Sequence, residues 1–239
     1  MTAIGRNNVQ IGASPVQLAK AVKNHVELEG FRNSHIKDGA ALCNYFGWLE
    51  NQLCVVGNKS IDEVSAADKL EQFRRMQPDC MGLSFDTISA VGPNAAIIHY
   101  KPERTTAKIL STDEIYLCDS GGQYRDGTTD VTRTCHFGTP KPFEKEAFTR
   151  VLKGNVSLNM TVFPSGVNGY QLDCIARASL WSVGLDYRHG TGHGVGHFLN
   201  VHEGPHGIGG RSSYSEIALK EGMIVTDGKL FLIKRTRLL

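Results

Sequence analysis

The feature that most constrains this chain is a run of alternating glycines and histidines, reading HGTGHGVGHFLNVH at 189–202. Glycine occupies every second position from 190 to 196, and each glycine inside a helix costs about 1 kcal/mol relative to alanine. An extended segment is therefore expected, with side chains on alternating faces. One face would be bare glycine, which another backbone can approach closely. The other face would carry His189, Thr191, His193, Val195 and His197.

Several imidazoles on one face favour metal binding or proton transfer, because histidine is both a common metal ligand and a near-neutral acid or base. The structural alternative is a buried, glycine-rich strand whose histidines only form hydrogen bonds.

A pair of carboxylates precedes this run. The segment 115–119 has the pattern of a buried strand that ends in Asp119, and 128–134 has the pattern of a β-branched strand that carries Asp130. A hairpin centred between Tyr124 and Arg125 would place the two acids opposite each other on one face. A turn at Asp126–Gly127 would break that register, and both arrangements stay open.

Two carboxylates near histidines make a donor set that suits manganese, cobalt or zinc. The alternative is that Asp119 merely ends a strand and that Asp130 pairs with Arg133, because structural ion pairs can imitate functional sites.

Four motifs resemble one known family. They read AAIIHY at 95–100, DSGGQYRDGTTDVTRT at 119–134, HGTGHGVG at 189–196 and NVHEGP at 200–205. Together they resemble the catalytic domain of the eukaryotic cytosolic Xaa-Pro aminopeptidases (aminopeptidase P) of peptidase family M24. The resemblance runs from about residue 14 to residue 227.

The resemblance implies an α/β pita-bread fold, in which two pseudo-symmetric halves surround a curved antiparallel sheet with flanking helices. It also implies two divalent ions, usually manganese, and release of an N-terminal residue from peptides with proline at the second position.

The resemblance also implies roles for individual residues. Asp119, Asp130 and His193 match three of the family's five metal ligands. His99, His189 and His202 match histidines that bind substrate and assist proton transfer. His197 matches no ligand.

The resemblance ends at the C-terminus. The family has a ligand glutamate directly after the segment that matches 222–227, and this chain has Gly228 there. We therefore expect a leader over 1–13, an incomplete pita-bread domain over 14–227 and a divergent tail over 228–239. Peptidase activity is expected to be impaired, and a catalytically silent fragment or binding module is the alternative.

Composition excludes several other classes. The net charge of +2 indicates no nucleic-acid partner, and no segment has the roughly 20 apolar residues of a membrane span. The six cysteines show no metal-binding spacing. That pattern favours reduced thiols and a cytoplasmic location, and nothing indicates an oligomeric state.

Periodicity and caps predict the remaining elements. Residues 16–53 are expected to be helical with a joint at Gly30 and a core stripe of Phe31, Ile36, Ala40, Cys43 and Phe46. Ser65 is expected to cap a helix that runs toward Met76. Further helices are expected over 142–160 and 170–183, and strands over 81–90 and 95–99. Residues 223–225 would be a strand at an unpaired sheet edge, 231–233 would partly cover that edge, and 234–237 would project into solvent.

Overall fold

The computed structural model describes residues 14–211, 216–228 and 234–235. The helices in this part of the chain are α1 (Pro15–Ala21), α2 (His25–Glu50), the π-helix η2 (Asn51–Val56), α3 (Glu63–Arg75), the 3₁₀-helix η3 (Gly92–Ala96), α4 (Pro142–Asn159) and α5 (Gly169–Trp181). The strands are β1 (Cys80–Leu83), β2 (Ile88–Val91), β3 (Tyr116–Ser120), β4 (Gly122–Tyr124), β5 (Gly127–Thr128), β6 (Val131–Cys135), β7 (Leu185–Asp186), β8 (Gly192–His193), β9 (Gly207–Ile208) and β10 (Lys234–Arg235).

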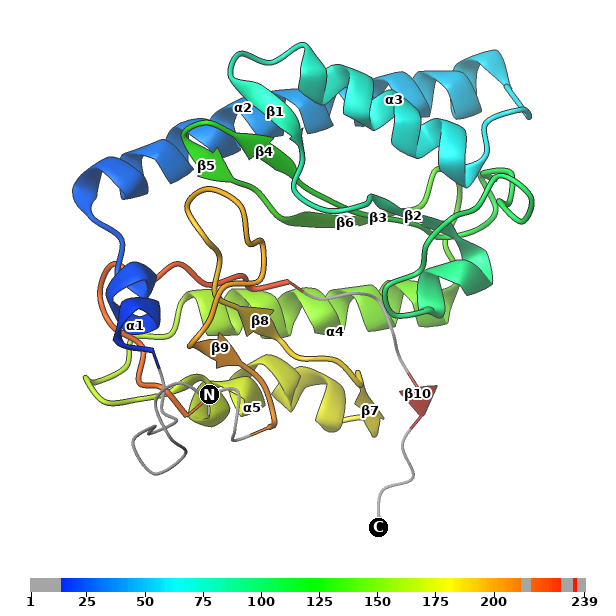
Figure 1. Cartoon of the computed structure of the whole chain (residues 1–239). Coiled ribbons are helices and arrows are strands. Elements are labelled where there is room, and N and C mark those ends of the chain that lie inside the picture. Colours follow the sequence, from blue (N-terminus) through cyan, green and yellow to red (C-terminus); the bar gives the residue numbers. More distant parts are fainter. Residues whose placement is uncertain (1–13, 212–215, 229–233, 236–239) are drawn as a thin grey trace, which may run out of the picture.

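The strands form small antiparallel sheets in the orders β1–β4–β5, β2–β3–β6, β8–β9 and β7–β10. In Figure 1, α2 and α3 lie together above the first two sheets, and α4 and α5 lie together below them, with β8 and β9 in front of α4 and α5. A mixture of helices and antiparallel sheets was expected and is confirmed. No helix in the described ranges is both long enough and apolar enough to cross a bilayer.

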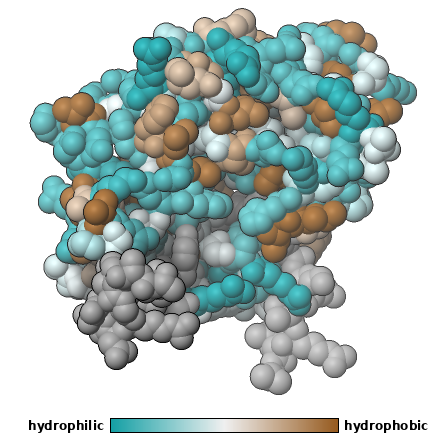
Figure 2. Space-filling view, viewed as in Figure 1, coloured by the Kyte–Doolittle hydropathy of each residue, from teal (hydrophilic) through white to brown (hydrophobic). Residues whose placement is uncertain are grey.

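The main core lies between α2, α3 and the sheet β2–β3–β6. Its fully buried side chains include Tyr45, Leu49, Leu70, Val91 and Tyr116. Figure 2 shows that hydrophobic residues on the outside stand in small separate groups among hydrophilic ones. Scattered exposed hydrophobic side chains of this kind are ordinary for a protein surface.

The break between the first two helices lies before Gly30, so the predicted joint is wrong. Asn24 accepts hydrogen bonds from the backbone N–H of Val26 and of Glu27, and the Glu27 side chain accepts one from the backbone N–H of Asn24. This capping box starts α2 at His25. Gly30 lies inside the helix, where a Cβ atom would come within 2.1 Å of the Asp126 carbonyl oxygen. The glycine therefore allows the β4–β5 hairpin to contact α2.

The predicted core stripe on α2 is also mostly wrong. Phe31 is buried as expected, but Ile36 is 72% exposed. The buried face continues instead through Ser34 and Asp38 to Tyr45. Hydrophobic periodicity failed to identify the buried face because that face carries polar residues. Asp38 can be buried there because it forms an ion pair with Arg74 at 2.7 Å.

The cap of α3 lies three residues earlier than predicted. Asp62 accepts a hydrogen bond from the backbone N–H of Ser65, and the Ser65 hydroxyl donates to the Asp62 carbonyl oxygen. Ser65 is therefore the third residue of the helix and not its cap.

Residues 95–99 are not a strand. Gly92, with a φ of +57°, begins η3, which runs to Ala96. The buried Glu63 carboxylate holds this region, because it accepts hydrogen bonds from the backbone N–H of Val91 and of Lys108 and from the side chains of Asn94 and Tyr100. These bonds replace the ladder of a strand.

The two helices of the C-terminal half begin and end within two residues of the predicted bounds. The glycine run is extended over a shorter length than expected, since only Gly192 and His193 form a regular strand, β8, which pairs with β9. Its bare face is confirmed, because a Cβ atom on Gly192 would lie 1.8 Å from the Thr226 carbonyl oxygen.

The segment 223–226 lies directly beside β8. Val225 forms a β-bridge with Gly194, and the backbone N–H of Thr226 donates to the His193 carbonyl oxygen. The expected edge is therefore paired on this side. The backbone of Lys234 and Arg235 forms β10 against β7, a pairing that was not predicted. Residues 231–233 and 236–237 lie outside the described residues.

Candidate metal centre and its histidines

The two candidate carboxylates lie on the same face of neighbouring strands. The observed turn is centred between Arg125 and Asp126, so Asp119 pairs with Thr132 and not with Asp130. This register differs by two residues from the first predicted hairpin. Side chains alternate with a period of two, so the shift leaves both acids on one face in a diagonal arrangement.

Asp119 is half-buried among polar and charged side chains. Its carboxylate accepts a hydrogen bond from the Thr132 hydroxyl at 2.9 Å. Burial, together with the negative charge of Asp130, raises the pKa of Asp119 to about 6. Two carboxylates whose charges repel each other in a half-buried site provide a natural place for a cation.

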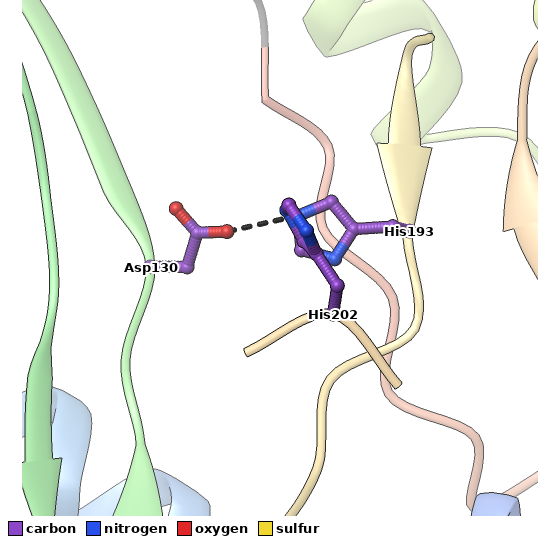
Figure 3. A group of neighbouring side chains, drawn as sticks. All are labelled: Asp130, His193 and His202. Atoms are coloured by element: carbon purple, nitrogen blue, oxygen red, sulfur yellow. Dashed lines mark ion pairs between the residues drawn. The ribbon is translucent and has the colours of Figure 1, made fainter. Parts of the chain in front are cut away.

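Asp130 faces His193 across the site (Figure 3). The Asp130 carboxylate lies 3.0 Å from Nε2 of His193, and Nδ1 of the same ring lies 3.0 Å from the Gly194 carbonyl oxygen. Burial acts to lower the pKa of His193, but the hydrogen bonds to Asp130 and to Gly194 outweigh it and raise the pKa. The alternative pairing of Asp130 with Arg133 is not observed, because the Arg133 guanidinium donates to the Thr132 carbonyl oxygen.

His202 completes a group of possible ligands. Its ring stands edge-on to the His193 ring, with the centroids 4.0 Å apart. One possible ligand atom from each of Asp130, His193 and His202 lies within 4.8 Å of the other two. Burial, together with the neighbouring His193, lowers the pKa of His202.

The two remaining predicted histidines enter the site from different segments. His99 has a φ of +55°, and the next residue, Tyr100, donates a hydrogen bond to Glu63 at 2.7 Å. The ring of His189 stacks on the ring of Tyr187 with centroids 4.7 Å apart. His197 lies elsewhere, because its ring packs edge-on against Phe31 on α2.

All six predicted site residues line one cavity of about 2110 Å³. Because the carboxylates come from the β2–β3–β6 region and three of the histidines come from 189–202, the cavity lies between the two halves of the chain. Gly228 lines it as well, and a Cβ atom there would meet no atom within 4 Å. The six residues are His99, Asp119, Asp130, His189, His193 and His202.

The donor set fits a divalent ion. Without a metal, Nε2 of His193 donates to the Asp130 carboxylate. Once that proton is lost, Nδ1–H still donates to the Gly194 carbonyl oxygen, and the lone pair on Nε2 becomes available to a metal ion. This is the orientation of a metal-ligating histidine whose other nitrogen is fixed by a hydrogen bond. Carboxylate oxygens and imidazole nitrogens together suit the borderline divalent ions.

Sequence reasoning missed the residues that hold the site in place. Thr132 supports Asp119, and Arg177 donates to the His189 carbonyl oxygen at 2.8 Å. The spacing of Asp173 and Arg177, four residues apart, marks a helical ion pair. Nothing in that spacing indicates which backbone the arginine contacts.

Comparison with known proteins identifies the family of the chain. Residues 29–228 match Metallopeptidase family M24. The Laccaria bicolor protein named Probable Xaa-Pro aminopeptidase P is 60% identical over 225 residues, which are 94% of this chain and 35% of that protein. Its namesake from Talaromyces marneffei is 58% identical over 93% of this chain and 34% of its own length. The chain thus spans about a third of the length of these curated relatives.

Solved structures give the same result. The X-prolyl aminopeptidase of Caenorhabditis elegans, described as a cytosolic enzyme with a di-nuclear active site, superposes with a TM-score of 0.87 at 45% identity. It covers 94% of this chain, which corresponds to 36% of that chain. The X-Pro aminopeptidase of Thermotoga maritima has a TM-score of 0.74 at 26% identity, over 92% of this chain and 59% of its own. These matches confirm the α/β pita-bread fold. With a family match over most of its length and this fold around the paired Asp130 and His193, the chain belongs to metallopeptidase family M24.

Proposed function

We propose that this chain is a metal-dependent aminopeptidase that releases an N-terminal residue preceding proline. The observation that carries the proposal is the contact of Asp130 with His193, whose second ring nitrogen is fixed by the Gly194 carbonyl, in one cavity with Asp119. The relatives' names support the choice of substrate, namely peptides with proline at the second position.

Asp119, Asp130 and His193 would hold the metal, and manganese is the ion that we propose. A bound divalent ion polarises the scissile carbonyl and lowers the pKa of a bound water. The three residues supply two negative charges, and His193 ligates as a neutral ring. The di-nuclear relative supports binding of divalent metal, and with only three of the family's five ligands the site in this chain would be incomplete.

Three histidines would act on the substrate. The lowered pKa of His202 keeps its ring neutral near pH 7, so that it can accept or donate a proton as a neutral group. His99 and His189 line the same cavity and would hold the peptide carbonyl and the amino end in place. A hydrogen-bond donor fixed near developing negative charge contributes more than one that must reorient.

We further propose that the catalytic unit extends over 14–227, after a leader at 1–13 and before a divergent tail at 228–239. Activity would be impaired, because Gly228 supplies no carboxylate to the cavity that it lines. The six cysteines are all free, which supports a cytoplasmic location. The second candidate function, a silent fragment or binding module of the same fold, rests on Gly228 alone.

The test is hydrolysis of an Xaa-Pro peptide by the purified chain with manganese, beside His193→Ala. We expect slow release of the N-terminal residue that requires manganese and is lost in His193→Ala. His197→Ala is the matched control, because it removes an imidazole of the same run that packs on Phe31. If hydrolysis is absent with manganese, cobalt and zinc alike, the silent module is the better description. Rapid hydrolysis that persists in His193→Ala would contradict both functions.

A further inference from the structure

The segment that carries His189 has little regular structure to hold it. Between β7, which ends at Asp186, and β8, which begins at Gly192, five residues pass along the cavity. The backbone N–H of Thr191 donates to the Ile208 carbonyl oxygen of β9, but residues 187–190 belong to no strand. His189 is nevertheless held in a defined place, with its ring stacked on Tyr187. Something other than strand pairing must fix this part of the backbone.

Arg177 of α5 supplies the missing hydrogen bonds. Its Nη1 donates to the Tyr187 carbonyl oxygen at 2.6 Å, and its Nη2 donates to the His189 carbonyl oxygen at 2.8 Å. These two donors form hydrogen bonds with the carbonyl oxygens of alternate residues, as the backbone N–H groups of a neighbouring strand would. An arginine suits this task, because its donors lie in a rigid planar fork.

The same guanidinium also fixes the ring beneath His189. The Arg177 guanidinium carbon lies 3.9 Å from the centroid of the Tyr187 ring, and that ring stacks on His189. A guanidinium at this distance from an aromatic face is attracted to it. Arg177 therefore restrains His189 in two ways: it holds the His189 backbone carbonyl, and it holds the Tyr187 ring on which the imidazole stacks.

Asp173 holds Arg177 itself in position. Its Oδ2 accepts from Nε of Arg177 at 2.7 Å, and its Oδ1 accepts from the Thr191 hydroxyl. The Tyr187 hydroxyl also contacts the Thr191 hydroxyl. Asp173, Arg177, Tyr187 and Thr191 are each at most 7% exposed. A buried ion pair is costly unless its hydrogen bonds are satisfied. Here Arg177 also donates to the Asp186 carboxylate of β7, and its other side-chain bonds beyond Asp173 reach the segment that carries His189.

We propose that Arg177 is a positioning residue for His189, and that Tyr187 transmits its effect to the imidazole. We call Asp173, Arg177, Tyr187 and Thr191 the arginine clamp. The clamp orients His189 toward the cavity and holds the approach to β8, which carries His193. Its consequence for catalysis rests on the proposed function, but its consequence for the position of His189 does not.

The test compares Arg177→Lys with Arg150→Lys. The control is closely matched, because Arg150 of α4 also pairs with an acid one turn away, Glu146, and also donates to a carbonyl oxygen, that of Ser179. Histidine ring signals are followed by NMR in the metal-free chain, with His189 assigned from a His189→Gln variant. Denaturant unfolding is measured on the same samples.

We expect Arg177→Lys to stay folded and to move the His189 ring signals toward those of an unstacked histidine. Arg150→Lys should leave them unchanged. Should Arg177→Lys fail to fold, Tyr187→Phe and Tyr187→Leu provide the second comparison. The phenylalanine keeps the ring and should preserve the His189 signals, and the leucine should not. Unchanged His189 signals in folded Arg177→Lys, or in folded Tyr187→Leu, overturn the proposal.

Hydrolysis provides the second readout. If the proposed function holds, kcat should fall by about 10- to 100-fold in Arg177→Lys, the cost typical of losing a group that orients a site residue, while KM changes less. Moved His189 signals without a change in kcat would leave the clamp in place and remove His189 from the reaction. Absence of hydrolysis in every variant would count against the proposed function and leave the NMR result to decide the clamp.

Discussion

Two buried arginines, one in each half of the molecule, hold their surroundings in different ways. Arg74 bonds only side chains, pairing with Asp38 and donating to Ser120, and it ties α2 and α3 to a sheet that already has its own ladder. Arg177 bonds the carbonyl oxygens of Tyr187 and His189, in a segment without a ladder. Arg74 thus links secondary-structure elements that already have their backbone hydrogen bonds. Arg177 supplies hydrogen bonds to a backbone segment that has no neighbouring strand among the described residues.

The comparison predicts the largest effect for Arg74→Met. Arg74 and Asp38 are both fully buried, so the substitution leaves an unpaired charge in the core. We expect the free energy of unfolding, measured with denaturant, to fall by about 3–5 kcal/mol. Arg75→Met is the control, because Arg75 pairs with Glu71 on the surface and should contribute less than about 1 kcal/mol. Similar losses in Arg74→Met and Arg75→Met would show that the buried Arg74–Asp38 pair matters no more to stability than a surface ion pair.

The second prediction concerns metal binding in the cavity between the two halves. Asp130→Asn removes the carboxylate that faces His193, and we expect the affinity for manganese to fall more than the 10- to 100-fold that loss of a supporting group costs. Free manganese measured by electron paramagnetic resonance reports the affinity. Asp126→Asn is the control, because its carboxylate bonds Lys37 outside the site. Equal affinity in Asp130→Asn and the unchanged chain would show that the ion binds elsewhere.

The third prediction concerns pH. The pKa of Asp119 is raised to about 6 by burial and by Asp130, so a proton must leave this carboxyl before it can bind a metal at lower pH. The apparent affinity for manganese should therefore be nearly constant above pH 6 as far as Asp119 is concerned. Below pH 6 it should fall by about tenfold per pH unit, with a further loss from His193, whose pKa is also raised.

The same shift has the opposite sign for the stability of the metal-free chain. The carboxyl is protonated in the folded state up to about pH 6, but in the unfolded state only up to its ordinary pKa of about 4. Asp119 therefore favours folding below pH 4, and this contribution is lost as the pH rises to 6. Asp119→Asn should remove the contribution of Asp119 to the pH dependence of manganese affinity and to the pH dependence of stability. A manganese affinity that is flat from pH 5 to pH 7 in the unchanged chain would contradict the raised pKa.

The smallest expected effects on stability come from glycine substitutions, which should differ between a glycine that allows close backbone approach and one that does not. Gly192→Ala would push a Cβ atom against the Thr226 carbonyl oxygen beside β8, whereas Gly47 on α2 has no atom within 4 Å of the added carbon. We expect thermal unfolding to show a loss of about 1–3 kcal/mol for Gly192→Ala, as for other overpacked positions. Gly47→Ala should gain up to about 1 kcal/mol from helix propensity. A gain in both variants would show that the glycine run needs no close approach.

The sequence predicted the C-terminal helices, and which candidate residues line one cavity, better than it predicted the contacts that hold them. The helix that begins at Pro142 follows from local propensity, and the site histidines follow from motif resemblance. The face of α2 could not be predicted, because Asp38 is buried by an arginine 36 residues away along the chain. The turn between Arg125 and Asp126 was missed for a similar reason. Gly30 and Asp126 fix the hairpin by a tertiary contact that carries no local signal.

The Glu63 carboxylate has a consequence for how the molecule opens. It receives the backbone N–H groups of Val91 and Lys108, at the two ends of the segment that includes His99. The native path of this segment and the position of α3, which begins at Glu63, therefore depend on each other. The amide protons of Val91 and Lys108 should exchange with solvent as one cooperative unit together with α3. Opening of this unit would remove one wall of the cavity, the one that carries His99.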